Sequence, residues 1–275
     1  MESVDSKRTP VDEPMTIGEH LEDIRKRVLR MVIAVGAIAF FILGFHITPY
    51  VYNGITLYYP SFSPFDNIAA QLTVVMKHHL LPSSVQLIQT APGQAFFAQF
   101  YIAVLLGITI GMPVIVREFV AFFRPAFDKK EIHIVRTITV PAVGLFIAGC
   151  LFSYFFVTPY ILQFLYKYGQ SADLLTFLNI VDFITFILQF LLAFGISFQL
   201  PLIMYAVTVS GIVDEKFWRR NIRYAIIGIV ILGAAITPDG SGVTMWFVSA
   251  PMIGLYIIGI ILSERQAKQT ATLKS

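Results

Sequence analysis

Long stretches of apolar residues without charged side chains are the feature that most limits how this chain can fold. A helix needs about 20 such residues to cross a hydrocarbon core of roughly 30 Å. Five stretches approach or exceed this length, and only the first contains a charge, Arg30. They are residues 28–45, 95–116, 138–157, 183–213 and 243–263. A sixth uncharged stretch, residues 224–236, is shorter, and we predict an all-α polytopic membrane protein with six transmembrane helices.

The composition excludes the common soluble classes. Charged residues make up 13% of the 275 residues and hydrophobic residues 56%, whereas soluble domains contain about 25% charged residues. A soluble globular domain, a disordered chain and a coiled coil are therefore excluded. The one cysteine, Cys150, lies in an apolar stretch, which excludes a disulfide framework and a cysteine-based metal site.

The basic residues are distributed very unevenly between the two sides of a six-helix arrangement. Only Lys77 and Lys167, of 20 Lys and Arg, fall on one side, and all the others fall on the side of the termini. Cytoplasmic segments carry an excess of Lys and Arg, so we expect both termini in the cytoplasm. We expect a flexible N-terminus (residues 1–15), a membrane domain (residues 16–264) and a cytoplasmic tail (residues 265–275).

The lengths of the later stretches predict an uneven bundle. Residues 183–213 would form a helix of about 46 Å, which must tilt, kink near Pro201 or project beyond the bilayer. Residues 224–236 would reach only about 20 Å, so we expect a concave bundle with short final helices. The alternative is that this helix runs a turn further. On the external side, the spacing of apolar residues predicts an amphipathic surface helix over residues 65–81.

The predicted spans hold none of the polar pairs that membrane enzymes or proton-coupled transporters need at membrane depth. The sequence has no nucleotide-binding or hydrolase motif. We therefore expect no catalytic residues, no cofactor, no metal site and no nucleic-acid partner. A small-solute secondary transporter is the alternative function, but it should show intramembrane charges and inverted repeats.

Acidic residues that lie among basic ones are the candidate binding groups of the cytoplasmic face. Asp23 and Arg27 are spaced i,i+4 on a helix that a capping-box pattern starts at Thr16. Glu131 follows a loop of aromatic and basic residues. These acids are either ordinary members of surface ion pairs or carboxylates presented to a cationic partner, and the residue pattern leaves both readings open.

Several short motifs, in order along the chain, resemble the TatC family, the receptor core of the twin-arginine protein translocase. Residues 20–27 are similar to its H-L-x-E-L-R-x-R motif, and residues 194–201 to the F-G-x-x-F-E-x-P stretch of its fourth span. Residues 237–239 match its T-P-D turn. Further positions that resemble the family pattern are Pro64, Thr90, Phe96, Pro113, Phe122, Pro125 and Glu131.

The resemblance implies a receptor in a prokaryotic plasma membrane that binds twin-arginine signal peptides of folded proteins. It implies export driven by the proton-motive force and recruitment of TatA-type partners, with or without TatB-type ones, in an oligomeric complex within membrane lipid. The signal-peptide site it implies consists of Asp23, Arg25, Phe122, Pro125 and Glu131. The partner or structural positions it implies are His20, Leu21, Pro64, Phe96, Gln199 and Asp239.

Two residues depart from the family pattern. Asp23 stands where the motif has glutamate, which keeps the charge on a side chain one methylene shorter. Gln199 stands where the fourth span of the family has glutamate. Glutamine can form hydrogen bonds but cannot ionise, so a titrating role at this position is excluded and a hydrogen-bonding role remains.

Overall fold

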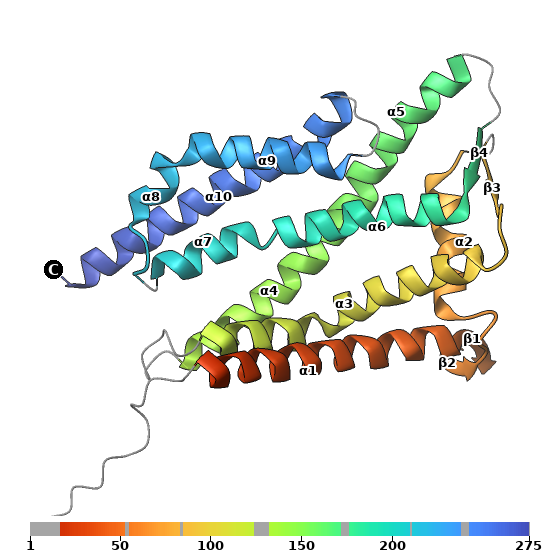
Figure 1. The fold of residues 1–275 in the computed structure, drawn as a ribbon, viewed down its shortest axis with the longest axis horizontal. Helices are drawn as coiled ribbons and strands as arrows, with labels where there is room; N and C mark the ends of the chain where they lie inside the picture. Colours follow the sequence, from red (N-terminus) through yellow and green to blue (C-terminus); the bar gives the residue numbers. More distant parts are fainter. Residues whose placement is uncertain are drawn as a thin grey trace, which may run out of the picture.

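The computed structural model describes residues 17–52, 55–82, 85–123, 132–171, 176–209, 211–237 and 242–274, and these are mostly helical (Figure 1). The long helices run roughly side by side, so that the bundle formed by the described residues has two opposite ends. The helices are α1 (Ile17–Gly44), α2 (Ile68–Leu80), α3 (Gln94–Phe123), α4 (Ile132–Phe152), α5 (Thr158–Ser171), α6 (Ile180–Ser197), α7 (Leu200–Val209), α8 (Glu215–Arg220), α9 (Ile222–Ile236) and α10 (Gly242–Lys274).

Five helical segments among these residues are long and apolar enough to cross a membrane. They are Gly18–Gly44, Gln94–Phe119, Thr139–Lys167, Ile180–Val209 and Gly242–Gln266. The sixth predicted span corresponds to α9, a shorter apolar helix of 15 residues. It begins only two residues before the predicted stretch, so the predicted short helix is found and not the alternative that is a full turn longer.

The prediction that both final helices are short is wrong for the last one. Helix α10 has 33 residues and continues to Lys274, through the segment predicted as a tail. The residues after Ser263 include Glu, Gln, Ala and Lys, which favour helix. Charged residues end an apolar stretch without ending the helix, and for this reason hydropathy underestimated the length of α10.

The long fourth stretch is broken where a kink was predicted. Helix α6 ends at Ser197, α7 begins at Leu200, and Pro201 lies in the first turn of α7. Proline fits the first turn of a helix because the missing N–H has no partner there in any case. The third stretch stays continuous through a π-helical turn, Ser153–Val157, that joins α4 to α5.

Two small sheets at one end of the molecule correct the all-α prediction. Strands β1 (Phe45–Tyr52) and β2 (Ile55–Phe62) form an antiparallel hairpin directly after α1. Strands β3 (Val85–Ile88) and β4 (Thr176–Asn179) pair in parallel. Both sheets are rich in the β-branched and aromatic residues that favour strands.

The predicted amphipathic helix is present as α2, slightly shorter than expected. Asn67 caps its N-terminus, because its side-chain oxygen accepts a hydrogen bond from the backbone N–H of Ala70 at 2.9 Å. Ala69, Met76 and Leu80 are buried on its inner face. The helix lies across the end of the bundle that also holds the two sheets (Figure 1).

The core lies around α6, whose Phe183, Phe190 and Phe194 are fully buried. Small residues let neighbouring helices approach it and each other closely, as in other membrane bundles. A Cβ atom built on Gly149 of α4 would lie 2.5 Å from the carbonyl oxygen of Phe194. One built on Gly107 of α3 would lie 2.8 Å from the carbonyl oxygen of Val35 of α1.

Candidate functional site

We call the end where α1 begins and α3 ends the basic end, because its described residues include Arg25, Lys26, Arg27, Arg30 and Arg117. It lies at the left of Figure 1. The i,i+4 pair predicted on α1 is present: Arg27 donates from Nε to Oδ2 of Asp23 at 2.8 Å. Both side chains are partly exposed, Asp23 at 36% and Arg27 at 20%.

A second carboxylate, which the sequence reasoning missed, lies beside this pair. Glu118, near the end of α3, has a side chain only 7% exposed. Its Oε2 accepts hydrogen bonds from Nη1 of Arg27 at 3.4 Å and from Nη1 of Arg30 at 3.2 Å. Arg27 therefore joins two acids, one on α1 and one on α3.

A sequence signal for Glu118 exists. Gly107 and Gly111 face α1, since Cβ atoms built on them would contact Val35. Residues spaced by four and by seven positions share one face of a helix, so Glu118 continues the same face seven residues after Gly111. The carboxylate thus points at α1, where Arg27 and Arg30 can reach it.

The other residues predicted for this site divide into two groups. His20, Leu21 and Arg25 lie on exposed parts of the first turns of α1, and Phe122 lies in the last turn of α3. Pro125, Glu131 and Asp239 lie outside the described residues. The structure therefore brings Asp23 together with Glu118 and two arginines, while the predicted pairing of Asp23 with Glu131 stays a prediction.

A further ion pair at the basic end joins α8 to α10. Arg219 donates from Nε to Oε1 of Glu264 at 2.6 Å and from Nη2 to Oε2 at 2.8 Å. The Glu264 carboxylate raises the pKa of Arg219 above its ordinary value, first through this hydrogen bond and then through charge attraction. Because Arg219 is largely exposed, the pair orients the two helices more than it stabilises them.

Gln199 lies at the break between α6 and α7. Its Nε2 donates to the carbonyl oxygen of Ala142 in α4 at 3.1 Å, with the carbonyl oxygen of Gly195 at 3.5 Å. The side chain is partly buried. It thus ties the interrupted span to α4, a role that an uncharged amide can fill and that needs no proton transfer.

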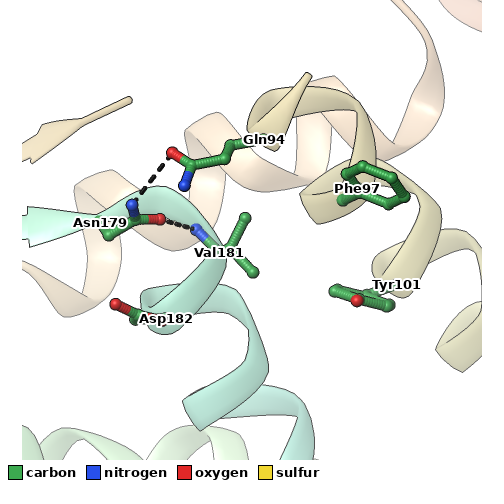
Figure 2. Close-up of a pocket in the computed structure, with 6 residues that line it drawn as sticks. All are labelled: Gln94, Phe97, Tyr101, Asn179, Val181 and Asp182. Atoms are coloured by element: carbon green, nitrogen blue, oxygen red, sulfur yellow. Dashed lines mark hydrogen bonds between the residues drawn. The ribbon is translucent and has the colours of Figure 1, made fainter. Parts of the chain in front are cut away.

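The opposite end of the bundle holds a cluster built around the side-chain amides of Asn179 and Gln94 (Figure 2). Nδ2 of Asn179, at the start of α6, donates to Oε1 of Gln94 at 3.0 Å and to Oγ1 of Thr90 at 2.8 Å. The same Gln94 oxygen accepts the backbone N–H of Thr90 at 2.9 Å. The cluster borders an open cavity of about 410 Å³, with Phe97, Tyr101 and Asp182 on its walls.

Two more predicted positions lie at this end and have structural contacts. The carbonyl oxygen of Pro64 accepts a hydrogen bond from Nδ2 of Asn67 at 3.0 Å, and the same nitrogen donates to Oε1 of Gln99 at 2.8 Å. Phe96 is 57% exposed and stacks with Phe100 at a centroid distance of 6.5 Å. Across the described ranges, no group of three His, Cys, Asp or Glu side chains could hold a metal ion.

Comparisons with known proteins agree with the motifs and the fold. A family model described as Sec-independent protein translocase protein (TatC) matches residues 19–251. A TatC protein of Cenarchaeum symbiosum is 61% identical over 255 residues, which are 93% of this chain and 97% of that protein. A TatC protein of Carboxydothermus hydrogenoformans is 30% identical over 254 residues, 92% of this chain and 94% of that one.

A solved structure has a similar fold. A crystal structure of the twin-arginine translocase receptor TatC matches with a TM-score of 0.73 and 26% identity, over 90% of this chain and 98% of that one. The chain therefore belongs to the TatC family of Sec-independent protein translocase proteins, and it is a multi-pass membrane component of that translocase.

Proposed function

We propose that this chain is the receptor core of a twin-arginine translocase and that its basic end binds the paired arginines of signal peptides. The observation that carries the proposal is the pair of carboxylates that bind one guanidinium group where α1 packs on α3. There the carboxylates of Asp23 and Glu118 already hold the guanidinium group of Arg27. Carboxylates that bind the guanidinium group of Arg27 have the chemistry to bind the guanidinium group of a peptide arginine.

Arginine suits such a site better than lysine does. Its planar guanidinium group stays charged and offers five N–H donors in a fixed fork, which a carboxylate can accept in a bidentate manner. Lysine has a compact ammonium group without this fork. A signal peptide bound at Asp23 would take the place that Arg27 occupies, so that binding is an exchange of one guanidinium group for another.

The second arginine of the signal needs a second acid. The family resemblance assigns this role to Glu131, with Arg25, Phe122 and Pro125 beside it. Glu118 is the buried acid that would hold Arg27 and Arg30 once Asp23 is taken, since its Oε2 already contacts both. Arg27 would therefore keep a carboxylate partner during the exchange.

We also infer the orientation and the partners from the residues. The basic end would face the cytoplasm of a prokaryotic cell, because basic residues gather on the cytoplasmic side of membrane proteins. TatA-type and TatB-type single-span helices would dock near Gln199, whose amide is a polar group at membrane depth, in a complex with several copies of this chain. The export itself would be driven by the proton-motive force, without a catalytic step in this chain.

Binding of a labelled twin-arginine signal peptide to the purified protein in detergent tests the receptor proposal. Asp23→Asn is expected to weaken binding about tenfold to 100-fold, because it removes the negative charge from a charge-assisted hydrogen bond worth about 1.5–3 kcal/mol. Asp23→Glu, which restores the residue of the family motif, should bind as the parent chain does. Glu131→Gln should weaken binding by a similar factor.

The controls separate recognition from general charge. Glu22→Gln, next to Asp23 in the sequence and paired with Lys26 on the exposed face of α1, should bind like the parent. A twin-lysine peptide should bind much more weakly than the twin-arginine peptide. Equal binding of both peptides, together with unchanged affinity of Asp23→Asn and Glu131→Gln, would show that these acids are ordinary surface charges.

A further inference from the structure

The absence of charge that marks the first span continues well beyond the end of its helix. From Met31 to Phe65 the chain contains no Asp, Glu, Lys or Arg, but α1 ends at Gly44. From Arg30 to Gly44 the helix rises about 21 Å, which is less than the roughly 30 Å of the hydrocarbon core. The hairpin that follows α1 therefore starts within the far leaflet or at its surface, and not in bulk water.

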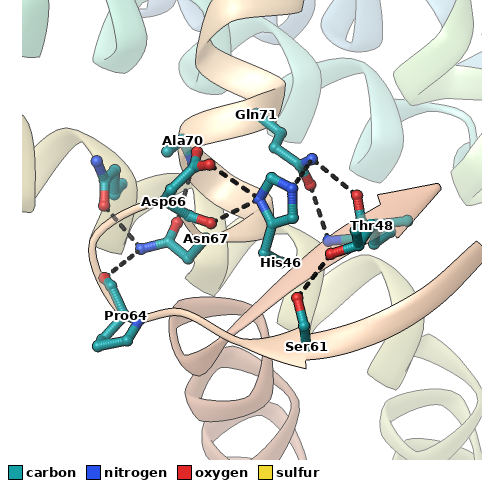
Figure 3. A network of polar contacts seen from close by, with 10 residues as sticks. His46, Thr48, Ser61, Pro64, Asp66, Asn67, Ala70 and Gln71 are labelled. Carbon is teal, nitrogen blue, oxygen red and sulfur yellow. Dashed lines mark hydrogen bonds and ion pairs between the residues drawn. The ribbon is translucent and has the colours of Figure 1, made fainter. Parts of the chain in front are cut away.

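A polar network fixes the base of this hairpin (Figure 3). Nδ1 of His46 lies 3.2 Å from Oδ2 of Asp66, and Oγ1 of Thr48 lies 2.7 Å from Oγ of Ser61. Gln71 of α2 binds the backbone of Ile47 through both amide atoms, at 3.2 and 3.1 Å. These contacts set the direction in which the hairpin leaves the bundle.

The two outer edges of the hairpin are poor templates for another strand. Pro49 lies opposite Tyr58 and Pro60 lies opposite Ile47 in the register, and proline has no N–H to donate. Prolines on edge strands prevent pairing with further strands. On β1, Gln71 already occupies the N–H and the carbonyl oxygen of Ile47. Strand addition from a second chain is therefore disfavoured.

Both faces of the hairpin are apolar, aromatic and exposed. Residues of a cross-strand pair share a face and successive pairs alternate, so Tyr58 and Leu57 lie on opposite faces; they are 70% and 53% exposed. The exposed large side chains of the two strands are Ile47, Tyr50, Val51, Ile55, Leu57, Tyr58, Tyr59 and Phe62. A two-stranded hairpin in water is at best marginally stable, so a surface of this kind needs an apolar environment on its faces.

We propose that the β1–β2 hairpin is a lipid-binding element that lies in the headgroup region of the leaflet at the end opposite the basic end. Tyrosine favours this region because its ring is apolar and its hydroxyl group can reach water. The backbone groups along the two edges exclude a deeper position, since hydrocarbon offers them no hydrogen-bond partner. The hairpin would hold the outer end of α1 at a fixed depth, independently of any signal-peptide binding.

Spin labels can measure the depth of the hairpin in the intact protein. Cys150 is the only cysteine, so Cys150→Ala gives a background for single labels at Tyr58→Cys and Leu57→Cys, one on each face. Phe40→Cys, on α1 with a 79% exposed side chain, is the lipid control, and Lys77→Cys, an exposed charged position in α2, is the water control. Each variant is reconstituted in vesicles of phosphatidylcholine and phosphatidylglycerol.

The readout is the ratio of collisions with oxygen, which enters lipid, to collisions with a water-soluble nickel chelate. Both hairpin labels should give a ratio above that at Lys77 and below that at Phe40. A ratio equal to that at Lys77 would overturn the proposal by placing the hairpin in water. Protection from both reagents would also overturn it, because the faces would then be covered by protein, such as a second copy of this chain. Unchanged thermal melting of the variants shows that the label sites do not disturb the fold.

Discussion

Replacing Gly149 with leucine is expected to abolish accumulation of the folded protein, whereas the same replacement at Gly144 should leave it close to the parent level. A Cβ atom at Gly149 would meet the carbonyl oxygen of Phe194 at 2.5 Å, its carbonyl carbon at 2.9 Å and the Cα of Gly195 at 3.0 Å. All three are backbone atoms of α6, which cannot move aside as the end of a side chain can.

The Gly149 replacement is expected to disrupt the packing of α4 against α6 at the centre of the bundle. Even one extra methyl group in a packed core costs about 1–3 kcal/mol, and leucine adds three more carbon atoms. Helix α6 would have to separate from α4, and the contact of Phe194 with its neighbours would be lost. Gly144 lies on the same helix but has no atom within 4 Å of a built Cβ, which makes it a matched control.

Folded yield after size-exclusion chromatography in detergent, together with a thermal melt, measures this difference. Gly149→Leu should give little monodisperse protein, and Gly144→Leu should give the parent yield and melting temperature. Equal yields of the two variants would mean that α4 and α6 do not cross at Gly149 as described.

Glu118→Gln is expected to produce the second large effect, a loss of about 2–3 kcal/mol in stability, because it removes the buried charge that two arginines share. Glutamine keeps the size of the side chain, so packing is unchanged and the loss reports the charge alone. Of its two carboxylate partners Arg27 would retain Asp23, and Arg30 would lose the negative charge of the carboxylate that lies 3.2 Å away.

An exposed pair on the same helix provides the comparison for Glu118. Glu22 and Lys26 lie 2.8 Å apart, but both side chains are more than 60% exposed, so Glu22→Gln should change stability by about 0.5 kcal/mol or less. Thermal melts in one detergent compare the two variants. The buried-clamp interpretation fails if the Glu118 and Glu22 variants melt at the same temperature.

Hydropathy and proline position account for much of the fold that the sequence predicted. The spans follow from the absence of charge, and the interruption of the fourth stretch lies just before Pro201, which then fits in the first turn of α7. Helix α2 follows from the i,i+3 and i,i+4 spacing of its apolar residues. These features depend on neighbours within one or two helical turns, which the sequence displays directly.

The features that were missed depend on other signals. Asn53-Gly54, between two runs of β-branched and aromatic residues, is a strong hairpin signal, but hydropathy does not reveal it. The length of α10 was underestimated because helix propensity, and not hydropathy, determines where a helix ends outside the apolar region. The parallel pairing of β3 with β4 joins segments far apart in the sequence, and no local pattern predicts it.

The sequence predicted only those contacts of the candidate site that join residues close together in the chain. Asp23 and Arg27 are one helical turn apart, so their contact follows from i,i+4 spacing. The contact of Arg27 with Glu118 joins residues on different helices, and only the glycine stripe on α3 indicates it. Family resemblance found Gln199 but not its partner, the carbonyl oxygen of Ala142, because a backbone acceptor leaves no mark in the sequence.

The break between α6 and α7 separates two packing units, one formed by α6 with α4 and the other by α7 with α10. Helix α6 packs closely on α4 at Gly149, whereas α7 packs on α10, where a Cβ on Gly259 would meet Met204 and Pro201. At residues 198–199 the helix gives way to a turn, in which the N–H of Gln199 donates to the carbonyl oxygen of Ile196 at 2.9 Å. We therefore expect any bending of α7 against α6 to concentrate at this turn, where the hydrogen bond from the Gln199 amide to the backbone of α4 would restrain it.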